Sequence, residues 1–246
     1  MNFFKIEILT KIYNNFKDNL SLTKLYLRIL IIVFSFIFSS SFFPTIPEGF
    51  VYLKEIDDTI IVNLKYYSSS NFTGRTIDGY FSNRGILTCQ AAEALKGAQK
   101  EFKKLGYSLV VFDAYRPQSS VDFFIEWSKD LNDTLNKILY YPDIKKADLF
   151  NLGYIAYKSG HSRGSTVDVS LIKISTNEQI DMGTIYDFFG VESSTYYSNI
   201  SDLQKNNRMI LYNVMTNNGF KNYSKEWWHF TLENEPYEKY YNFPVQ

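Results

Sequence analysis

Both histidines of the chain lie in short segments that also hold an acidic side chain. His161 precedes Asp168 within one polar stretch, and His229 follows Glu226 in the stretch E-W-W-H. Two imidazoles and one carboxylate form a ligand set that zinc accepts, with a fourth position left for water. Because the chain has only two histidines and one cysteine, a metal site must draw on nitrogen and oxygen ligands. The pattern predicts that His161, Asp168 and His229 hold one zinc ion.

Two further side chains complete the chemistry of a metal-dependent hydrolase. Zinc lowers the pKa of water to about 7 and polarises the carbonyl under attack, but a base must carry the proton and a cation favours the oxyanion. Glu226 is the predicted base, and Arg116, which follows a hydrophobic stretch at 108–112, is the predicted oxyanion partner. Residues three apart on a straight strand point to opposite faces. Glu226 is therefore expected in the turn before the strand of His229, or on a bulge.

Each of these residues also has an ordinary structural explanation. A histidine beside tryptophans is usually packed or partly exposed, an arginine past a strand end is often a surface residue, and Asp168 alone fits a solvated strand face. The spacing of one histidine and one aspartate is weak by itself. The joint occurrence favours a metal site, because both histidines fall in segments that carry an acidic partner.

The composition excludes several other classes of protein. Lysine plus arginine and aspartate plus glutamate total 26 each, so the net charge is zero. A general electrostatic grip on nucleic acid is thereby excluded, although a local basic patch is not. With 246 residues, 45% of them hydrophobic, the chain is too apolar to be disordered and long enough to bury a core. Its single cysteine, Cys89, allows no disulfide framework, and we predict no nucleic-acid and no protein partner.

The N-terminal part differs from the rest of the chain. Several lysines and Arg28 precede an uncharged run at 29–43, which ends near a small-x-small pattern at Ser39 and Ser41. A basic flank and a short apolar run are typical of an export signal, and the run is shorter than the roughly 20 apolar residues that span a bilayer. An uncleaved membrane anchor and a buried core helix stay open as alternatives. We predict a signal or anchor at 1–45 and a catalytic domain at 46–246. The catalytic domain is expected to be exported, and to be either periplasmic or attached through 29–43 to the outer face of the inner membrane, rather than cytoplasmic.

The elements that must position these residues mix strands and helices without a regular alternation. We predict strands at 51–56, 59–64, 108–112, 167–171 and 227–232, and helices at 91–105, 121–129 and 202–218. Gly106 and Gly219 follow two of the helices as stop signals, and Ser201 is a capping residue. Alternation in 167–171 places Asp168 and Ser170 on one face. The mixed order favours an α+β fold over a doubly wound sheet.

Several segments of the chain, taken together and in order, match the motifs of one family. The stretch S-G-H-S-R-G-S-T-V-D at 159–168 is similar to S-x-H-S-R-G-S-x-x-D, and the stretches at 226–229 and 113–117 match E-W-W-H and D-x-Y-R-P. Weaker matches lie at 71–74, 78–80, 182–187, 234–237 and 242–245. The chain thereby resembles the zinc-dependent D-alanyl-D-alanine dipeptidases, relatives of D,D- and L,D-carboxypeptidases, over about residues 50–246. One departure is Tyr186, where the family segment has phenylalanine.

The resemblance implies roles for the matching residues. For the five residues of the metal site it implies the roles assigned above, with Glu226 acting as base and then as acid. It implies that Ser159 contacts the carboxylate end of a dipeptide and Asp187 its ammonium end, and that Tyr66 and Tyr80 line the pocket. The implied fold is an α+β domain with helices around a central antiparallel sheet.

The resulting hypothesis is a zinc metallopeptidase that hydrolyses the dipeptide D-Ala-D-Ala to two D-alanines, which would recycle D-alanine from cell-wall turnover. The alternative enzyme is a D,D- or L,D-carboxypeptidase that trims peptidoglycan stem peptides. Asp187 favours the dipeptidase, because the interior end of a peptide has no ammonium to pair with a carboxylate. A zinc-holding module without catalysis would need neither Glu226 nor Arg116, and a structural membrane-anchored protein would make the two histidines a coincidence.

Overall fold

The computed structural model of the chain describes Glu7, Lys11 and Tyr26 and the continuous range 46–246. The predicted export segment at 29–43 lies outside the described residues. The chain divides into two units, Met1–Thr45 and Ile46–Gln246, and the second unit is the one described below. Within the described ranges, no helix is both long enough and apolar enough to cross a membrane.

A six-stranded sheet forms the centre of the second unit, with the strand order β2-β4-β5-β8-β7 and with β6 paired to β5. A separate antiparallel pair joins β1 and β3. The strands span β1 Phe50–Tyr52, β2 Ile61–Val62, β3 Ile86–Thr88, β4 Tyr107–Asp113, β5 Thr166–Lys173, β6 Glu178–Gln179, β7 Phe220–Asn222 and β8 His229–Leu232. The predicted mixture of a sheet with several helices is confirmed. The sheet is antiparallel except for β2 and β4, which pair in parallel, because the chain crosses between them through a helix.

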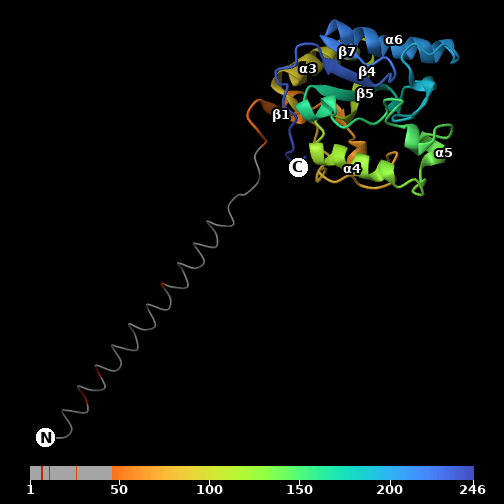
Figure 1. Cartoon of the computed structure of the whole chain (residues 1–246). Coiled ribbons are helices and arrows are strands. Elements are labelled where there is room, and N and C mark those ends of the chain that lie inside the picture. The colour runs from red at the N-terminus through yellow and green to blue at the C-terminus, as the bar shows by residue number, and fades with distance from the viewer. Residues whose placement is uncertain (1–6, 8–10, 12–25, 27–45) are drawn as a thin grey trace. The chain divides into compact units, whose positions relative to one another are not determined.

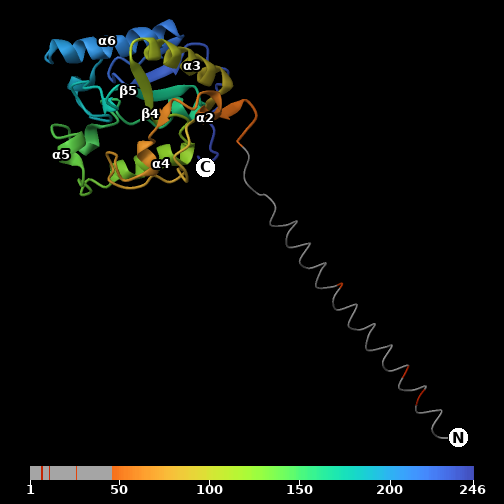
Figure 2. The ribbon, with the colours of Figure 1, turned by 180° about the vertical axis from the view of Figure 1, so that it is seen from behind.

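Helices cover the sheet on both sides. Figures 1 and 2 show α3 and α6 together on one side of the sheet, and α4 and α5 on the opposite side. The α-helices span α2 Leu53–Ile56, α3 Cys89–Lys104, α4 Gln118–Lys129, α5 Lys137–Tyr140 and α6 Asp202–Asn217, and the 3₁₀ helices span η1 Lys65–Tyr67, η2 Lys146–Asp148, η3 Gly160–Arg163 and η4 Val191–Ser193. This layered arrangement buries one continuous core of aliphatic and aromatic side chains.

The two long helices follow local sequence signals. In α3, a row of apolar side chains from Ala91 to Phe102 is buried, and the chain leaves the helix at Gly106 with φ +83°. In α6, the Ser201 side chain accepts from the Gln204 backbone while the Gln204 side chain accepts from the Ser201 backbone, which is a capping box. Gly219 follows with φ +83°. The helices predicted at 91–105 and 202–218 are therefore confirmed to within two residues at each end.

Other predicted elements differ in extent. The strand predicted at 51–56 ends at Tyr52, and the chain continues as the helical turn α2. The strand predicted at 59–64 is only the two residues of β2, and the strand predicted at 227–232 begins at His229, after a turn. These short segments are shaped by pairing with distant strands, such as β1 with β3, and local propensity does not report such pairing.

The sheet brings residues from three strands into one row. Asp168 on β5 pairs in register with His229 on β8 and with Asp113 on β4. The pairing of β4 with β5 shifts between Val111 and Asp113, and such an irregularity re-aims the side chain that follows it. Because directly paired residues present their side chains on the same face, the row places two acids and a histidine side by side.

Candidate active site

Three ligand atoms converge beside this row. His161 Nε2 lies 3.3 Å and His229 Nδ1 lies 3.0 Å from Asp168 Oδ1, and the three residues present ligand atoms within 4.8 Å of one another. Asp168 is 2% exposed, which excludes a solvated strand face. Its Oδ1 atom is buried and has no hydrogen-bond partner among the described residues. Because an unpaired buried carboxylate oxygen is costly, this donor set fits a cation.

His161 is held so that one ring nitrogen, which lies 3.4 Å from His229 Nδ1, keeps its lone pair for that cation. Its Nδ1 donates to the Ala114 carbonyl at 2.7 Å, so Nε2 carries the lone pair that faces Asp168. The residue lies in η3, which Ser159 caps by accepting from the His161 backbone N–H at 3.3 Å. Gly164 ends η3 with φ +85°, where a Cβ would collide with the Phe50 ring. The glycine-flanked loop of the sequence is thus a tight turn that fixes the imidazole.

The charges of the cluster also suit a metal. Burial by itself would raise the pKa of Asp168, but electrostatic attraction to His161 and His229 outweighs it and holds that pKa below its ordinary value. Burial would lower the pKa of His229, whereas the negative charge of Asp168 beside it raises that pKa above the ordinary value. Asp168 therefore stays ionised, and protons compete with a metal for His229.

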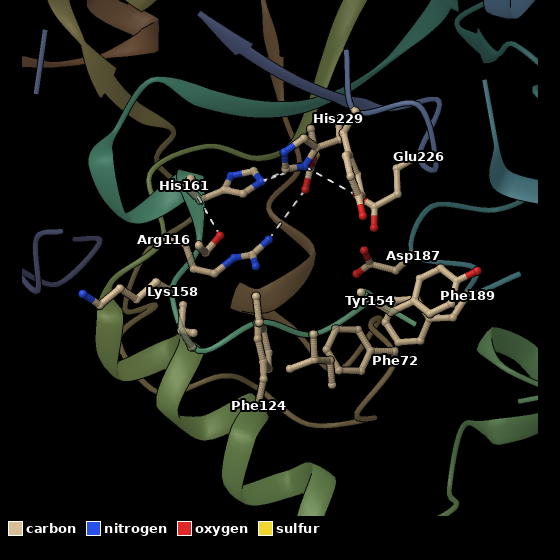
Figure 3. Close-up of a pocket in the computed structure, with 18 of the residues that line it drawn as sticks. Phe72, Arg116, Phe124, Tyr154, Lys158, His161, Asp187, Phe189, Glu226 and His229 are labelled. Carbon is tan, nitrogen blue, oxygen red and sulfur yellow. Dashed lines mark hydrogen bonds and ion pairs between the residues drawn. The ribbon is translucent and has the colours of Figure 1, made fainter. Parts of the chain in front are cut away.

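Glu226 lies in the turn between β7 and β8, as its spacing from His229 requires. Its backbone N–H donates to the Tyr223 carbonyl at 2.9 Å, and its carbonyl accepts from Asn222 Nδ2 at 3.0 Å. Its Oε2 atom lies 3.5 Å from His229 Nδ1, so the carboxyl group stands directly beside the cluster (Figure 3). Burial raises the pKa of Glu226 to about 7, against the opposing pull of His229.

Arg116 follows β4, and contacts with three side chains hold its guanidinium group in place. Its Nε donates to Asp113 Oδ2 at 2.8 Å, its Nη2 lies 3.7 Å from Asp168 Oδ2, and its guanidinium carbon lies 4.9 Å from the centre of the Tyr66 ring. Asp113 in turn accepts from the Tyr80 hydroxyl at 2.5 Å. Tyr80 therefore supports Asp113 and is not one of the pocket-lining residues, which corrects the expectation for this residue.

A single pocket of about 250 Å³ collects the predicted site residues. All seven line it: Arg116, Ser159, His161, Asp168, Asp187, Glu226 and His229. Figure 3 shows Glu226 and Asp187 on one side of the pocket and Lys158 on the other. The predicted Tyr66 lines it as well, together with aromatic walls that sequence reasoning did not assign: Phe72, Phe124, Tyr154, Phe189 and Tyr223. Nothing in their spacing sets these aromatic residues apart from core residues.

Asp187 is a buried carboxyl group in a strained backbone position. Its φ is +60°, a conformation that costs energy for a side chain other than glycine. Its Oδ2 accepts from the Tyr66 hydroxyl at 2.7 Å. Burial, and after it the negative charge of Asp168, raises the pKa of Asp187 well above its ordinary value. An isolated buried acid of this kind is suited to a ligand that brings a positive charge.

Arg208 on α6 holds the loop that carries Asp187. Its Nε donates to the Met182 carbonyl and its Nη1 donates to the Ser194 carbonyl, both at 2.6 Å. The two carbonyls bracket the loop, so one buried side chain fixes both of its ends. Sequence reasoning missed this residue because an arginine inside a helix gives no sign of being buried.

Comparison with known proteins agrees with this geometry. A sequence model of the family described as "D-ala-D-ala dipeptidase" matches residues 47–246. The D-alanyl-D-alanine dipeptidases of Enterococcus faecalis and Enterococcus faecium are 42% and 40% identical to the chain over 199 residues. That of Streptomyces coelicolor is 39% identical over 197 residues. Each comparison covers 80% of this chain and 98% of the relative.

Proposed function

Because the chain belongs to the D-Ala-D-Ala dipeptidase family, we propose that it hydrolyses D-Ala-D-Ala to two D-alanines at a metal centre held by His161, Asp168 and His229. Peptidases of this family are metal-dependent. The observation that carries the proposal is the buried, unpaired Asp168 Oδ1 atom, which faces two imidazole nitrogens in the pocket of Glu226 and Arg116. Two nitrogens and one oxygen suit Zn²⁺, and we propose one such ion per chain.

The protein's own groups then carry the proton and the charge. A bound Zn²⁺ supplies a Lewis acid for the scissile carbonyl and acidifies water. Glu226 takes a proton from the attacking water and returns it to the leaving amine nitrogen, a task that its place beside His229 allows. Arg116 keeps its charge at every relevant pH, and its clamp to Asp113 holds it ready for the negative charge that develops on the carbonyl oxygen.

The pocket accounts for a dipeptide substrate. Asp187 pairs with the substrate ammonium, and the Ser159 hydroxyl, which accepts from the His161 backbone, still has its proton to donate to the substrate carboxylate. A longer peptide has an amide where the dipeptide has its ammonium, so it would leave Asp187 buried without a positively charged partner. The relatives share the dipeptidase name, and nothing in the comparisons favours a stem-peptide carboxypeptidase.

Export of the catalytic unit is a separate proposal. It rests only on the basic residues and the uncharged run at 29–43, which lie outside the described residues. We propose that this segment directs residues 46–246 to the outside of the inner membrane, where D-Ala-D-Ala from cell-wall turnover is the available substrate.

The test uses residues 46–246, which span nearly the whole length of the relatives. D-alanine release from D-Ala-D-Ala is followed with and without Zn²⁺, with Glu226→Ala as the control for the base. We expect zinc-dependent release that the variant loses. Equal rates on D-Ala-D-Ala and on a muramyl pentapeptide with the same ending would contradict the dipeptide selectivity. Metal binding without any hydrolysis would leave only a binding module.

A further inference from the structure

The Tyr186 hydroxyl joins the metal cluster to the substrate subsite. It donates to Asp168 Oδ2 at 2.9 Å and lies 3.2 Å from the Tyr66 hydroxyl, which donates to Asp187 Oδ2 at 2.7 Å. Tyr186 and Tyr66 are both buried.

The two oxygens of Asp168 have different surroundings. Oδ1 faces the two histidines and has no hydrogen-bond partner among the described residues. Oδ2 accepts from Tyr186, with Arg116 Nη2 farther off at 3.7 Å. A carboxylate with one oxygen engaged in this way presents the other oxygen alone. Hydrogen bonds to a metal ligand fix its orientation and contribute to metal affinity.

We propose that Tyr186 is a positioning residue for the metal centre, whose hydroxyl holds Asp168 Oδ2 so that the metal is bound through Oδ1 alone. This inference rests on the metal site of the proposed function. Tyr186 touches neither the substrate nor the reacting atoms in this role, since it acts through Asp168.

The ring of Tyr186 is held without help from its hydroxyl. It packs against Phe112 with ring centres 5.0 Å apart and against Trp228 with ring centres 5.4 Å apart. Tyr186→Phe therefore removes one oxygen atom and leaves the ring contacts in place. A purely structural hydroxyl would affect the stability of the fold and leave metal affinity unchanged, so the two roles can be separated.

The chain offers two matched control variants. Tyr66→Phe removes the neighbouring hydroxyl, which bonds Asp187, but leaves the bond from Tyr186 to Asp168 intact. Tyr141→Phe removes a buried hydroxyl that has no hydrogen-bond partner among residues 46–246 and does not line the pocket. The first controls for any change in the tyrosine pair, and the second controls for the loss of a buried hydroxyl as such.

The experiment measures metal binding by the full-length chain and its three variants without substrate. Zn²⁺ affinity is determined by competition with a coloured chelator at one pH, and the visible spectrum of the Co²⁺-loaded protein reports the number of ligands. We expect Tyr186→Phe to weaken Zn²⁺ binding about tenfold and to reduce the Co²⁺ absorption as Asp168 begins to bind through both oxygens. Tyr66→Phe and Tyr141→Phe are expected to bind both metals as the unchanged protein does, and Tyr66→Phe to raise KM for D-Ala-D-Ala.

The outcomes separate this inference from the proposed function. An unchanged Zn²⁺ affinity and Co²⁺ spectrum in Tyr186→Phe would overturn the inference, while dipeptide hydrolysis by the unchanged protein would still support the function. If the unchanged protein binds Zn²⁺ and cleaves no dipeptide, the function fails and the affinities alone decide the inference. An equal loss of affinity in Tyr141→Phe would also overturn it, because the effect would then belong to any buried hydroxyl.

Discussion

Glu226→Gln is expected to stabilise the metal-free protein at alkaline pH while it removes the proposed catalytic base. The Glu226 side chain is 13% exposed, and burial raises its pKa from 4.5 to about 7. An unfolded chain ionises this group near its ordinary pKa, whereas the folded chain must ionise a buried carboxyl beside Asp168. Since the native state then binds more protons than the unfolded state, this group makes stability fall as pH rises from about 4.5 to about 7.

The size of the effect follows from the difference in pKa. At about 1.4 kcal/mol for each pKa unit, the difference between 4.5 and 7 corresponds to a loss of roughly 3 kcal/mol in the free energy of unfolding above pH 7. Partial exposure of the side chain reduces this figure, so about 2 kcal/mol is the lower bound we expect. Glutamine has nearly the same shape as a protonated glutamate and does not ionise. The variant therefore does not lose this stability as the pH rises, and the free energies of unfolding of the two proteins differ most at alkaline pH.

Urea unfolding of residues 46–246 in a metal chelator, at pH 5 and at pH 8, measures this difference. From pH 5 to pH 8, the free energy of unfolding of the variant should rise by about 2 to 3 kcal/mol relative to that of the unchanged protein. Glu178→Gln is the matched control, since Glu178 is exposed on β6. The same difference in the free energy of unfolding between Glu226→Gln and the unchanged protein at both pH values would refute the reasoning.

Three further predictions concern the pocket. Arg116→Lys should lower kcat for D-Ala-D-Ala by roughly 100-fold or more. The reason is that an ammonium cannot keep the contact with Asp113 and also face the oxyanion. Steady-state kinetics will show whether kcat or KM changes. Asp187→Asn should raise KM for D-Ala-D-Ala but leave an N-acetylated dipeptide, which has no ammonium, no worse a substrate than before. Arg208→Met should cost about 2–4 kcal/mol of stability, measured by urea unfolding, because it removes a buried charged donor from the carbonyls of Met182 and Ser194, of which Ser194 keeps the Tyr197 backbone N–H.

Residue types indicated which side chains gather at the candidate site better than local pattern predicted the elements that support them. His161, Asp168, His229 and Glu226 could be selected because metal ligands and a base are few and distinctive in this sequence. The long helices were also predictable, since periodicity and caps are local signals. The register that aligns Asp113 with Asp168 could not be predicted in this way, because it depends on pairing between strands far apart in the chain.

The charge in and behind the pocket favours joint binding of the proposed metal and the proposed substrate. Four buried or nearly buried carboxyl groups gather there, opposite one nearly buried guanidinium: Asp113, Asp168, Asp187 and Glu226 against Arg116. The raised pKa values of Asp187 and Glu226 reflect burial and, in both cases, the negative charge of Asp168. A divalent cation and the substrate ammonium bring three positive charges to this excess, and a bound cation favours ionised carboxyl groups around it. Saturating Zn²⁺ should therefore remove the pH-dependent difference between Glu226→Gln and the unchanged protein, and a difference that persists with zinc bound would place the metal elsewhere.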